Sequence, residues 1–166
     1  MKTTTNTNTN NTTARPASES INAFTAASTL ERLKLTQVYN QTNVTDFWFT
    51  PEDGHDRYEG EFTKNGKTYI VEAKNRANTS TKYPTTLIEA SKVNFLRTKA
   101  AAENKIPLLI IFFTDNQFGI YNLNNIQESW RSTKYCNRTT AASTGKVNKD
   151  VYLIPITFES LRELQY

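Results

Sequence analysis

The sequence has a single cysteine, Cys136, and a single histidine, His55, among its 166 residues. A lone cysteine excludes an internal disulfide and is typical of proteins in a reducing compartment. One histidine excludes zinc sites built from several histidines, and it argues against a Ser-His-Asp catalytic triad.

Long hydrophobic runs are also lacking. The longest purely apolar run is Leu108 to Phe113, six residues, whereas a membrane helix needs roughly 20. Residues 3 to 13 are only Thr and Asn, so the beginning of the chain has no apolar signal-peptide core. We therefore expect a cytoplasmic protein with no membrane partner. Residues 1–17 are expected to be a disordered Thr/Asn-rich tail, and residues 18–166 a single domain.

Positive and negative charges are separated along the chain, although the net charge is only +4. Residues 64 to 105 hold nine Lys or Arg and three Glu, whereas residues 46 to 61 hold six acids and one base. A basic half that follows an acidic cluster is what a polyanion-binding surface with a cation site would show, although ordinary solvated charge gives the same composition.

The hydrophobic pattern predicts an α/β (α+β mixed sheet) fold, with a central mixed sheet flanked by helices. The strand at 108–113 is continuously apolar and should lie parallel to the strand at 67–75, since a helix connects them. The expected elements are a helix at 18–38 that is firm from the capping box at Ser28, strands at 44–49, 56–63 and 67–75, a helix from Pro84 to Asn104 with a capping box at Thr86, strands at 108–113 and 118–123, a mobile loop at 133–149, a strand at 151–156 with Pro155 at a sheet edge, and a short helix at 158–164.

The most informative segment is the hairpin around Asn65-Gly66. Its second strand ends in Glu72-Ala73-Lys74, and residues two apart on a strand project from the same face. Two charges at the end of an otherwise apolar strand are costly to bury unless they pair or bind something.

The turn decides which acid of the first strand these two side chains meet. A two-residue turn at Asn65-Gly66 would place Asp56 opposite Asn75, on the wrong side. A three-residue loop, Lys64-Asn65-Gly66, would place Asp56 opposite Lys74 and one diagonal step from Glu72. Gly66 in the third loop position favours the three-residue loop.

With these residues in place, the sequence resembles the PD-(D/E)XK nuclease superfamily, whose pattern is an acid on one strand and then Asp/Glu-x-Lys on the next, followed by a helix and a buried strand. The resemblance implies a restriction-endonuclease-like core in which Asp56, Glu72 and the backbone carbonyl of Ala73 bind Mg²⁺, with Mn²⁺ as a substitute. It implies that Lys74 holds the attacking water and stabilises the developing charge. His55 stands where the family has proline.

Further residues are candidates for the same site. Asp53 is a rival to Asp56 as the first acid, and His55 is a candidate for proton transfer or phosphate contact. Glu31 matches the helical acid that some members of the family supply, and Glu89 is either a helix cap or a supporting residue of the site. Phosphate contacts are expected from Asn75, Arg76, Lys82, Tyr83 and Lys92.

These residues predict a Mg²⁺-dependent DNA endonuclease that hydrolyses phosphodiester bonds with a metal-activated water. The alternative is a non-catalytic module of the same fold that binds nucleic acid or another partner. A homodimer is possible, because cutting two strands needs two active sites.

Overall fold

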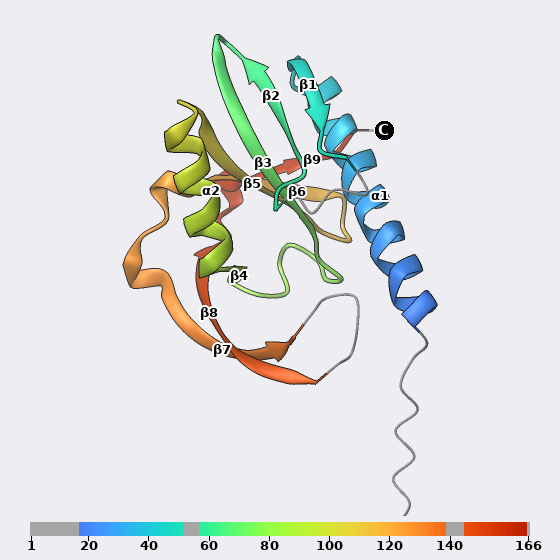
Figure 1. Cartoon of the computed structure of the whole chain (residues 1–166), viewed down its shortest axis with the longest axis vertical. Helices are drawn as coiled ribbons and strands as arrows, with labels where there is room; N and C mark the ends of the chain where they lie inside the picture. The colour runs from blue at the N-terminus through green and yellow to red at the C-terminus, as the bar shows by residue number, and fades with distance from the viewer. Residues whose placement is uncertain (1–16, 52–56, 139–144, 166) are drawn as a thin grey trace, which may run out of the picture.

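The computed structural model describes residues 17–51, 57–138 and 145–165, with side chains from residue 26 onward except residue 27. These residues form two α-helices and nine strands (Figure 1). They are α1 (Ala17–Gln41), β1 (Thr45–Phe49), β2 (Gly60–Lys64), β3 (Lys67–Asn75), β4 (Thr85–Glu89), α2 (Ala90–Ala102), β5 (Ile106–Phe112), β6 (Gln117–Asn122), β7 (Arg131–Asn137), β8 (Lys146–Pro155) and β9 (Leu161–Glu163), with three short 3-10 helices at Leu123–Asn125, Glu128–Trp130 and Phe158–Ser160.

Six strands form a mixed sheet in the order β1-β2-β3-β5-β6-β9. Strands β3 and β5 are parallel, and the other neighbours are antiparallel. All residues of β5 after Ile106 are buried, as expected for a strand covered on both faces. The predicted mixed sheet flanked by helices, with its parallel central pair, is confirmed.

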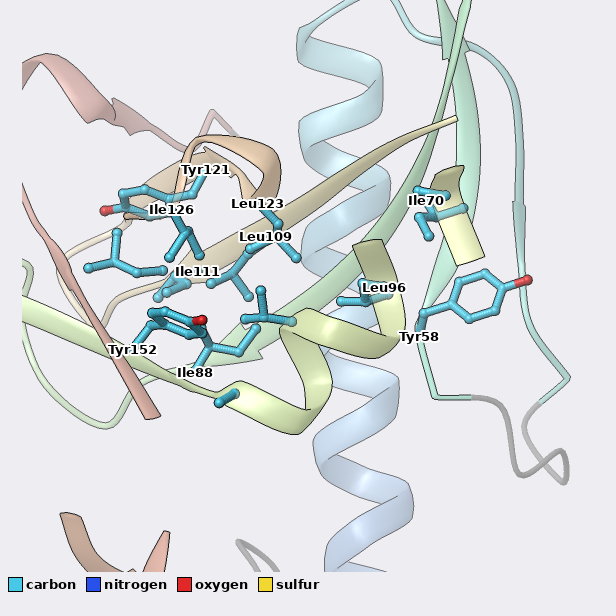
Figure 2. Packing of buried hydrophobic residues seen from close by; sticks show 14 of the residues in the cluster. Tyr58, Ile70, Ile88, Leu96, Leu109, Ile111, Tyr121, Leu123, Ile126 and Tyr152 are labelled. Carbon is cyan, nitrogen blue, oxygen red and sulfur yellow. The ribbon is translucent and has the colours of Figure 1, made fainter. Parts of the chain in front are cut away.

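The two helices lie on opposite faces of this sheet (Figure 1). Helix α1 packs Leu35, Val38 and Tyr39 on Val71 and Ala73 of β3. On the other face, the buried side chains of α2 pack against alternate residues of β3 and β5 and against other elements, and together they form a second hydrophobic cluster (Figure 2). The buried residues of this cluster include Ile70, Val93, Leu96, Leu109, Ile111, Leu123 and Tyr152. Strand β3 therefore has helices over both of its faces. Glu72, Lys74 and Asn75 lie toward its C-terminal end.

The turn between β2 and β3 has two residues, which contradicts the predicted three-residue loop. Lys64 pairs with Lys67, and Gly60 pairs with Val71. Asn65 and Gly66 have φ of 51° and 72°, so both occupy the left-handed region that a tight hairpin turn requires. Lys64 pairs within the ladder, and Gly66 is the second loop residue rather than the third.

The segment that follows β3 also differs from the prediction. Residues Thr85–Glu89 form β4 rather than the first turn of a helix, and α2 begins at Ala90. Glu89 stands at the N-cap position without a side-chain capping bond. A β-branched run favours a strand once a partner strand is present, and that partner is β8, which pairs with β4 from Pro155 to Val151.

The predicted mobile loop at 133–149 is largely a ribbon of two strands. Strands β4, β8 and β7 form a second, three-stranded sheet in which β7 and β8 pair from Arg131 with Tyr152 to Asn137 with Lys146. Residues 139–144 lie outside the described residues. The polar composition hid this pairing, because the ribbon is exposed on both faces and needs no apolar alternation.

The C-terminal elements were partly mispredicted. Pro155 is the last residue of β8, which is the middle strand of the second sheet and not an edge strand. The pairing of β7 with β8 extends only to Tyr152, so from Leu153 to Pro155 β8 pairs with β4 alone. The expected helix at 158–164 is one 3-10 turn followed by β9, which pairs with β6. Among the described residues, no helix is both long and apolar enough to cross a membrane.

Candidate functional site

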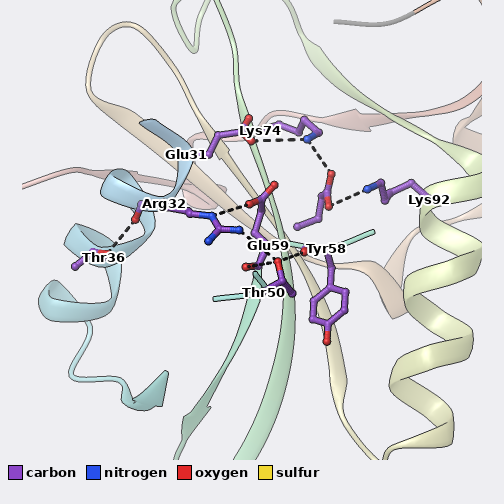
Figure 3. A network of polar contacts seen from close by, with 9 residues as sticks. Glu31, Arg32, Thr36, Thr50, Tyr58, Glu59, Lys74 and Lys92 are labelled. Carbon is purple, nitrogen blue, oxygen red and sulfur yellow. Dashed lines mark hydrogen bonds and ion pairs between the residues drawn. The ribbon is translucent and has the colours of Figure 1, made fainter. Parts of the chain in front are cut away.

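The candidate site is built around Glu72, a carboxylate in the interior of the mixed sheet. Glu72 is only 1% exposed and is accompanied by two amines. Lys74 Nζ lies 2.8 Å from its Oε1, and Lys92 Nζ donates to its Oε2 at 3.1 Å. Such a buried charge is tolerated only when it is compensated, and here one compensating lysine comes from β3 and the other from α2 (Figure 3).

Lys74 lies between two carboxylates. It projects from the same face of β3 as Glu72, as predicted, and its Nζ is 3.9 Å from Oε2 of Glu31. Burial by itself lowers the pKa of Lys74, but the negative charges of Glu72 and Glu31 outweigh it and raise the pKa above its usual value. Lys74 is therefore an ammonium at neutral pH.

Glu31 reaches the site from α1. Its Oε1 accepts a hydrogen bond from the backbone N–H of Asn75 at 2.9 Å, so the carboxylate is fixed beside the end of β3. Burial raises the pKa of Glu31, and the nearby Lys74 partly opposes this increase. The structure thus brings the predicted helical acid next to Lys74 (Figure 3).

Glu59 is a member of this cluster that the sequence interpretation did not single out. Its backbone N–H donates to the carbonyl of Val71 at 2.8 Å, although Val71 pairs with Gly60. Two successive residues thus face one partner, as in a β-bulge, and the Glu59 carboxylate turns toward Arg32 of α1 at 3.7 Å. Burial, followed by the charges of Glu72 and Glu31, raises the pKa of Glu59 to about 7.

A bulge of this kind changes which face a side chain occupies, and simple alternation cannot anticipate it. The only sequence signal is Gly60 itself. A Cβ at Gly60 would stand 2.3 Å from the Trp48 carbonyl oxygen, so this close approach of β1 requires glycine.

The backbone of β3 contributes an oxygen at the same place. Arg76 N–H donates to Phe112 of β5, whereas Asn75 N–H turns the other way to Glu31. Successive residues of a strand direct their polar groups to opposite sides, so the Ala73 carbonyl points away from β5. It points to the side where β2 has already ended, since β2 pairs only up to Val71.

A solvent-open cavity of about 170 Å³ lies beside Glu72 and Lys74, where the two sheets meet. Arg76 forms one wall, with its guanidinium donating to Thr86 Oγ1 at 3.3 Å and to the Leu87 carbonyl. The cavity is lined by Glu72, Lys74, Arg76, Leu87, Ile88, Glu89 and Lys92. Three cations and two carboxylates thus line this space.

The other predicted residues lie in different places. Asp53, His55 and Asp56 are outside the described residues. Lys82 and Tyr83 lie in the loop before β4, where the Lys82 amine stands 5.4 Å from the centroid of the exposed Tyr83 ring. Glu89 faces the cavity and forms an ion pair with Lys149 at 2.5 Å. Sequence reasoning gave Lys149 no role.

The side-chain amide of Asn75 is buried beside the site. Both polar atoms of its amide are buried and have no hydrogen-bond partner within the described part of the chain. A buried amide without partners costs free energy, and this one stands one residue after Lys74.

The donor chemistry of the site suits a hard divalent cation. The oxygens available are the Glu72 and Glu59 carboxylates and the Ala73 carbonyl, and Mg²⁺ commonly uses one or two carboxylates together with waters. The raised pKa of Glu59 reflects its burial first and then the negative charges of Glu72 and Glu31. In residues 17–51, 57–138 and 145–165, however, no three His, Cys, Asp or Glu side chains are grouped closely enough to hold a metal by themselves.

Comparison with known proteins gives a distant structural likeness. No protein-family model matches the sequence, and no curated protein matches it. Among solved structures, one similar chain is Hjc, a Holliday junction resolvase from the hyperthermophilic archaeon Archaeoglobus fulgidus. The TM-score is 0.49 and the identity 11%, over 77% of this chain and 95% of that chain.

Proposed function

We propose that this protein is a Mg²⁺-dependent DNA endonuclease that hydrolyses phosphodiester bonds with water. The observation that carries the proposal is the pairing of Lys74 with the nearly inaccessible Glu72 at 2.8 Å, at the edge of a solvent-open cavity. A buried ion pair contributes little to stability compared with apolar residues of the same volume. Charged clusters of this kind at a cavity are typical of functional sites.

Each residue has a role in this proposal. Glu72, the Ala73 carbonyl and an acid from the preceding segment hold the cation; the two-residue turn removes the register argument for Asp56, so Asp56, Asp53 and Glu59 are equal candidates for that acid. When bound, Mg²⁺ lowers the pKa of a water and neutralises phosphate charge. Lys74, already an ammonium, orients the scissile phosphate and stabilises the charge that builds at phosphorus.

Cations further along the cavity complete this arrangement. The Arg76 guanidinium is fixed on β4 and faces the space beside Lys74. The Lys92 amine also donates to the Arg57 carbonyl at 2.8 Å, which fixes its position against Glu72. Both are placed to contact phosphate oxygens of a polyanionic substrate. Asn75 can complete its hydrogen bonding on the same substrate.

The proposal is tested by incubating supercoiled plasmid and linear DNA with the protein and Mg²⁺ or Mn²⁺. We expect cleavage by the wild type and a loss of about 100-fold or more for Lys74→Ala and Glu72→Gln, because each removes a group that acts on the transition state. The matched control is Lys105→Ala, which breaks another close ion pair, 2.6 Å to the buried Glu61, away from the cavity.

Two outcomes contradict the proposal. If Lys105→Ala loses as much activity as Lys74→Ala while both variants remain folded, the Lys74 pair has no special role. If the wild type binds DNA but does not cleave it with either metal, the alternative of a non-catalytic nucleic-acid-binding module is favoured. That alternative draws on the two lysines that already neutralise Glu72. The homodimer stays a prediction.

A further inference from the structure

One face of the second sheet runs continuously from the cavity out along the β7–β8 ribbon. Glu89 of β4 pairs with Val151, and Val151 pairs with Ser132, so these side chains lie on one face. Side chains alternate along strands, so Lys149 and Lys134, which face each other in the ladder, share it. We call this surface the ribbon face; its residues are Lys134, Cys136, Val147 and Lys149, together with Arg138, which directly follows β7 and whose N–H donates to the Gly145 carbonyl.

The ribbon projects from the rest of the molecule and contributes little to the core. Figure 1 shows it curving away from β4. Every residue of β7 is exposed or half-buried, and β8 becomes fully buried only from Val151. A two-stranded ribbon is marginally stable in isolation, so the exposed part of this ribbon is better suited to contacting a partner than to stabilising the fold.

Within the described residues, acidic groups neutralise only part of the charge of the ribbon face. Lys134 stands directly opposite Lys149, and like charges at such a position destabilise a ladder. Lys149 forms an ion pair with Glu89 at the cavity rim. In the part of the chain that the structure describes, Lys134 and Arg138 have no acidic partner.

The opposite face of the same ribbon is different. There Arg131 Nε donates to Asp150 at 3.0 Å, and the Lys146 amine stands 6.0 Å from the centroid of the Tyr135 ring. Among the described residues, two positive charges without an acidic partner, Lys134 and Arg138, thus lie on the face that continues from the cavity, and one, Lys146, lies on the opposite face. This asymmetry indicates a partner that is negatively charged and reaches the cavity.

We infer that the ribbon face binds the phosphate backbone of double-stranded DNA beside the bond held in the cavity. This inference rests on the proposed function and adds a substrate class to it. Val151, which pairs with Glu89 at the cavity, lies five residues from Lys146 at the start of β8. Five residues span about 17 Å of strand, which corresponds to about five base pairs of duplex. A two-stranded ribbon also fits the major groove.

Duplex is favoured over single-stranded nucleic acid because the ribbon face carries no aromatic side chain. Single-strand sites combine cations with aromatic rings on which bases stack. The exposed aromatic residue of the ribbon, Tyr135, is 68% exposed but lies on the other face, opposite Asn148.

The test measures binding of the full chain to a labelled duplex of about 30 base pairs and to the matching single strand, with EDTA present and over a range of salt concentrations. The variant is Lys134→Ala with Arg138→Ala. The control is Lys67→Ala with Lys146→Ala, which removes the same charge from the distant β2–β3 turn and from the opposite face of the ribbon. We expect the ribbon-face variant to bind duplex about 10- to 30-fold more weakly near 0.15 M salt, with a salt slope reduced by about two.

The outcomes separate this inference from the nuclease proposal. Equal weakening by both double variants, unchanged binding in the ribbon-face variant, absence of duplex binding by the wild type, or loss confined to the single strand overturns the ribbon-face inference. Because these measurements need no metal and no turnover, ribbon-dependent duplex binding without cleavage in Mg²⁺ overturns the nuclease proposal alone.

Discussion

Negative charge is crowded around one ammonium at the end of β3. Glu31 and Glu59 both have raised pKa values because they are buried near Glu72. Lys74 remains charged because the same carboxylates favour its ammonium form. A residue-level consequence is that the protonation of Glu59 near neutral pH affects both the stability of the fold and the readiness of the site for a cation.

The stability of the protein should therefore depend on Glu59 between about pH 4.5 and pH 7. The pKa of this carboxyl is raised from 4.5 to about 7 on folding, so above pH 4.5 the unfolded chain loses a proton that the folded chain keeps. Stability then falls as the pH rises, by on the order of 2–3 kcal/mol up to about pH 7. Glu59→Gln, which resembles the protonated form, should lose this dependence.

Urea unfolding at about pH 4.5, 6 and 8 checks this expectation. Glu163→Gln serves as the control, because Glu163 is an exposed residue of β9. Parallel stability curves for wild type and Glu59→Gln would show that Glu59 has an ordinary pKa in the folded protein.

At the scale of elements, Gly60 joins the hairpin to the site. It lies against β1, where a Cβ would be 2.3 Å from the Trp48 carbonyl oxygen, and it is the second residue of the bulge that turns Glu59 toward α1. The two-residue turn at Asn65-Gly66 fixes the register of the same hairpin. These glycines have different physical roles, which substitution can separate.

Gly60→Ala should destabilise the protein by about 2 kcal/mol, since the added methyl group collides with backbone that cannot move aside. Gly66→Ala is the matched comparison, because a Cβ there meets nothing within 4 Å and only the φ of +72° is unfavourable, at about 1 kcal/mol. Thermal and urea unfolding measure both. A cost for Gly60→Ala no greater than that for Gly66→Ala would contradict the close approach of β1.

On the scale of the whole molecule, the cavity lies where two sheets meet. The mixed sheet supplies Glu72 and Lys74, and Arg76 directly follows β3. The second sheet supplies Leu87 and Glu89, and α2 adds Lys92. Anything that binds there links both sheets and so stabilises the whole fold. The ribbon face extends the same junction outward.

Mg²⁺ should therefore raise the melting temperature of the wild type. A ligand that binds the folded state at 100 times its Kd stabilises it by about 2.7 kcal/mol, a shift of several degrees for a domain of this size. Glu72→Gln should abolish the shift, and Lys105→Ala should retain it. Calorimetric scans with Mg²⁺ and with matched ionic strength of NaCl test this; an equal rise in Glu72→Gln would place the cation elsewhere.

Local patterns in the sequence were sufficient for several of these features. The continuous apolar run from Leu108 predicted a buried strand, and the spacing of Glu72 and Lys74 predicted a shared face, because both depend only on strand periodicity. The Thr86 capping box wrongly predicted a helix start, and the polar composition of 133–149 wrongly predicted a loop. Both segments are strands only because β8 pairs with β4 on one side and with β7 on the other.

The amino-acid sequence by itself determined the central strands, the Glu72-x-Lys74 pair and the excess of positive charge that follows it. Only the tertiary structure decided which further acids surround Lys74. Glu31 is 43 residues away along the chain and reaches Lys74 across the packing of α1 on the sheet, and Glu59 is turned inward by a bulge. Such contacts depend on packing and on local breaks in periodicity, neither of which a residue pattern specifies.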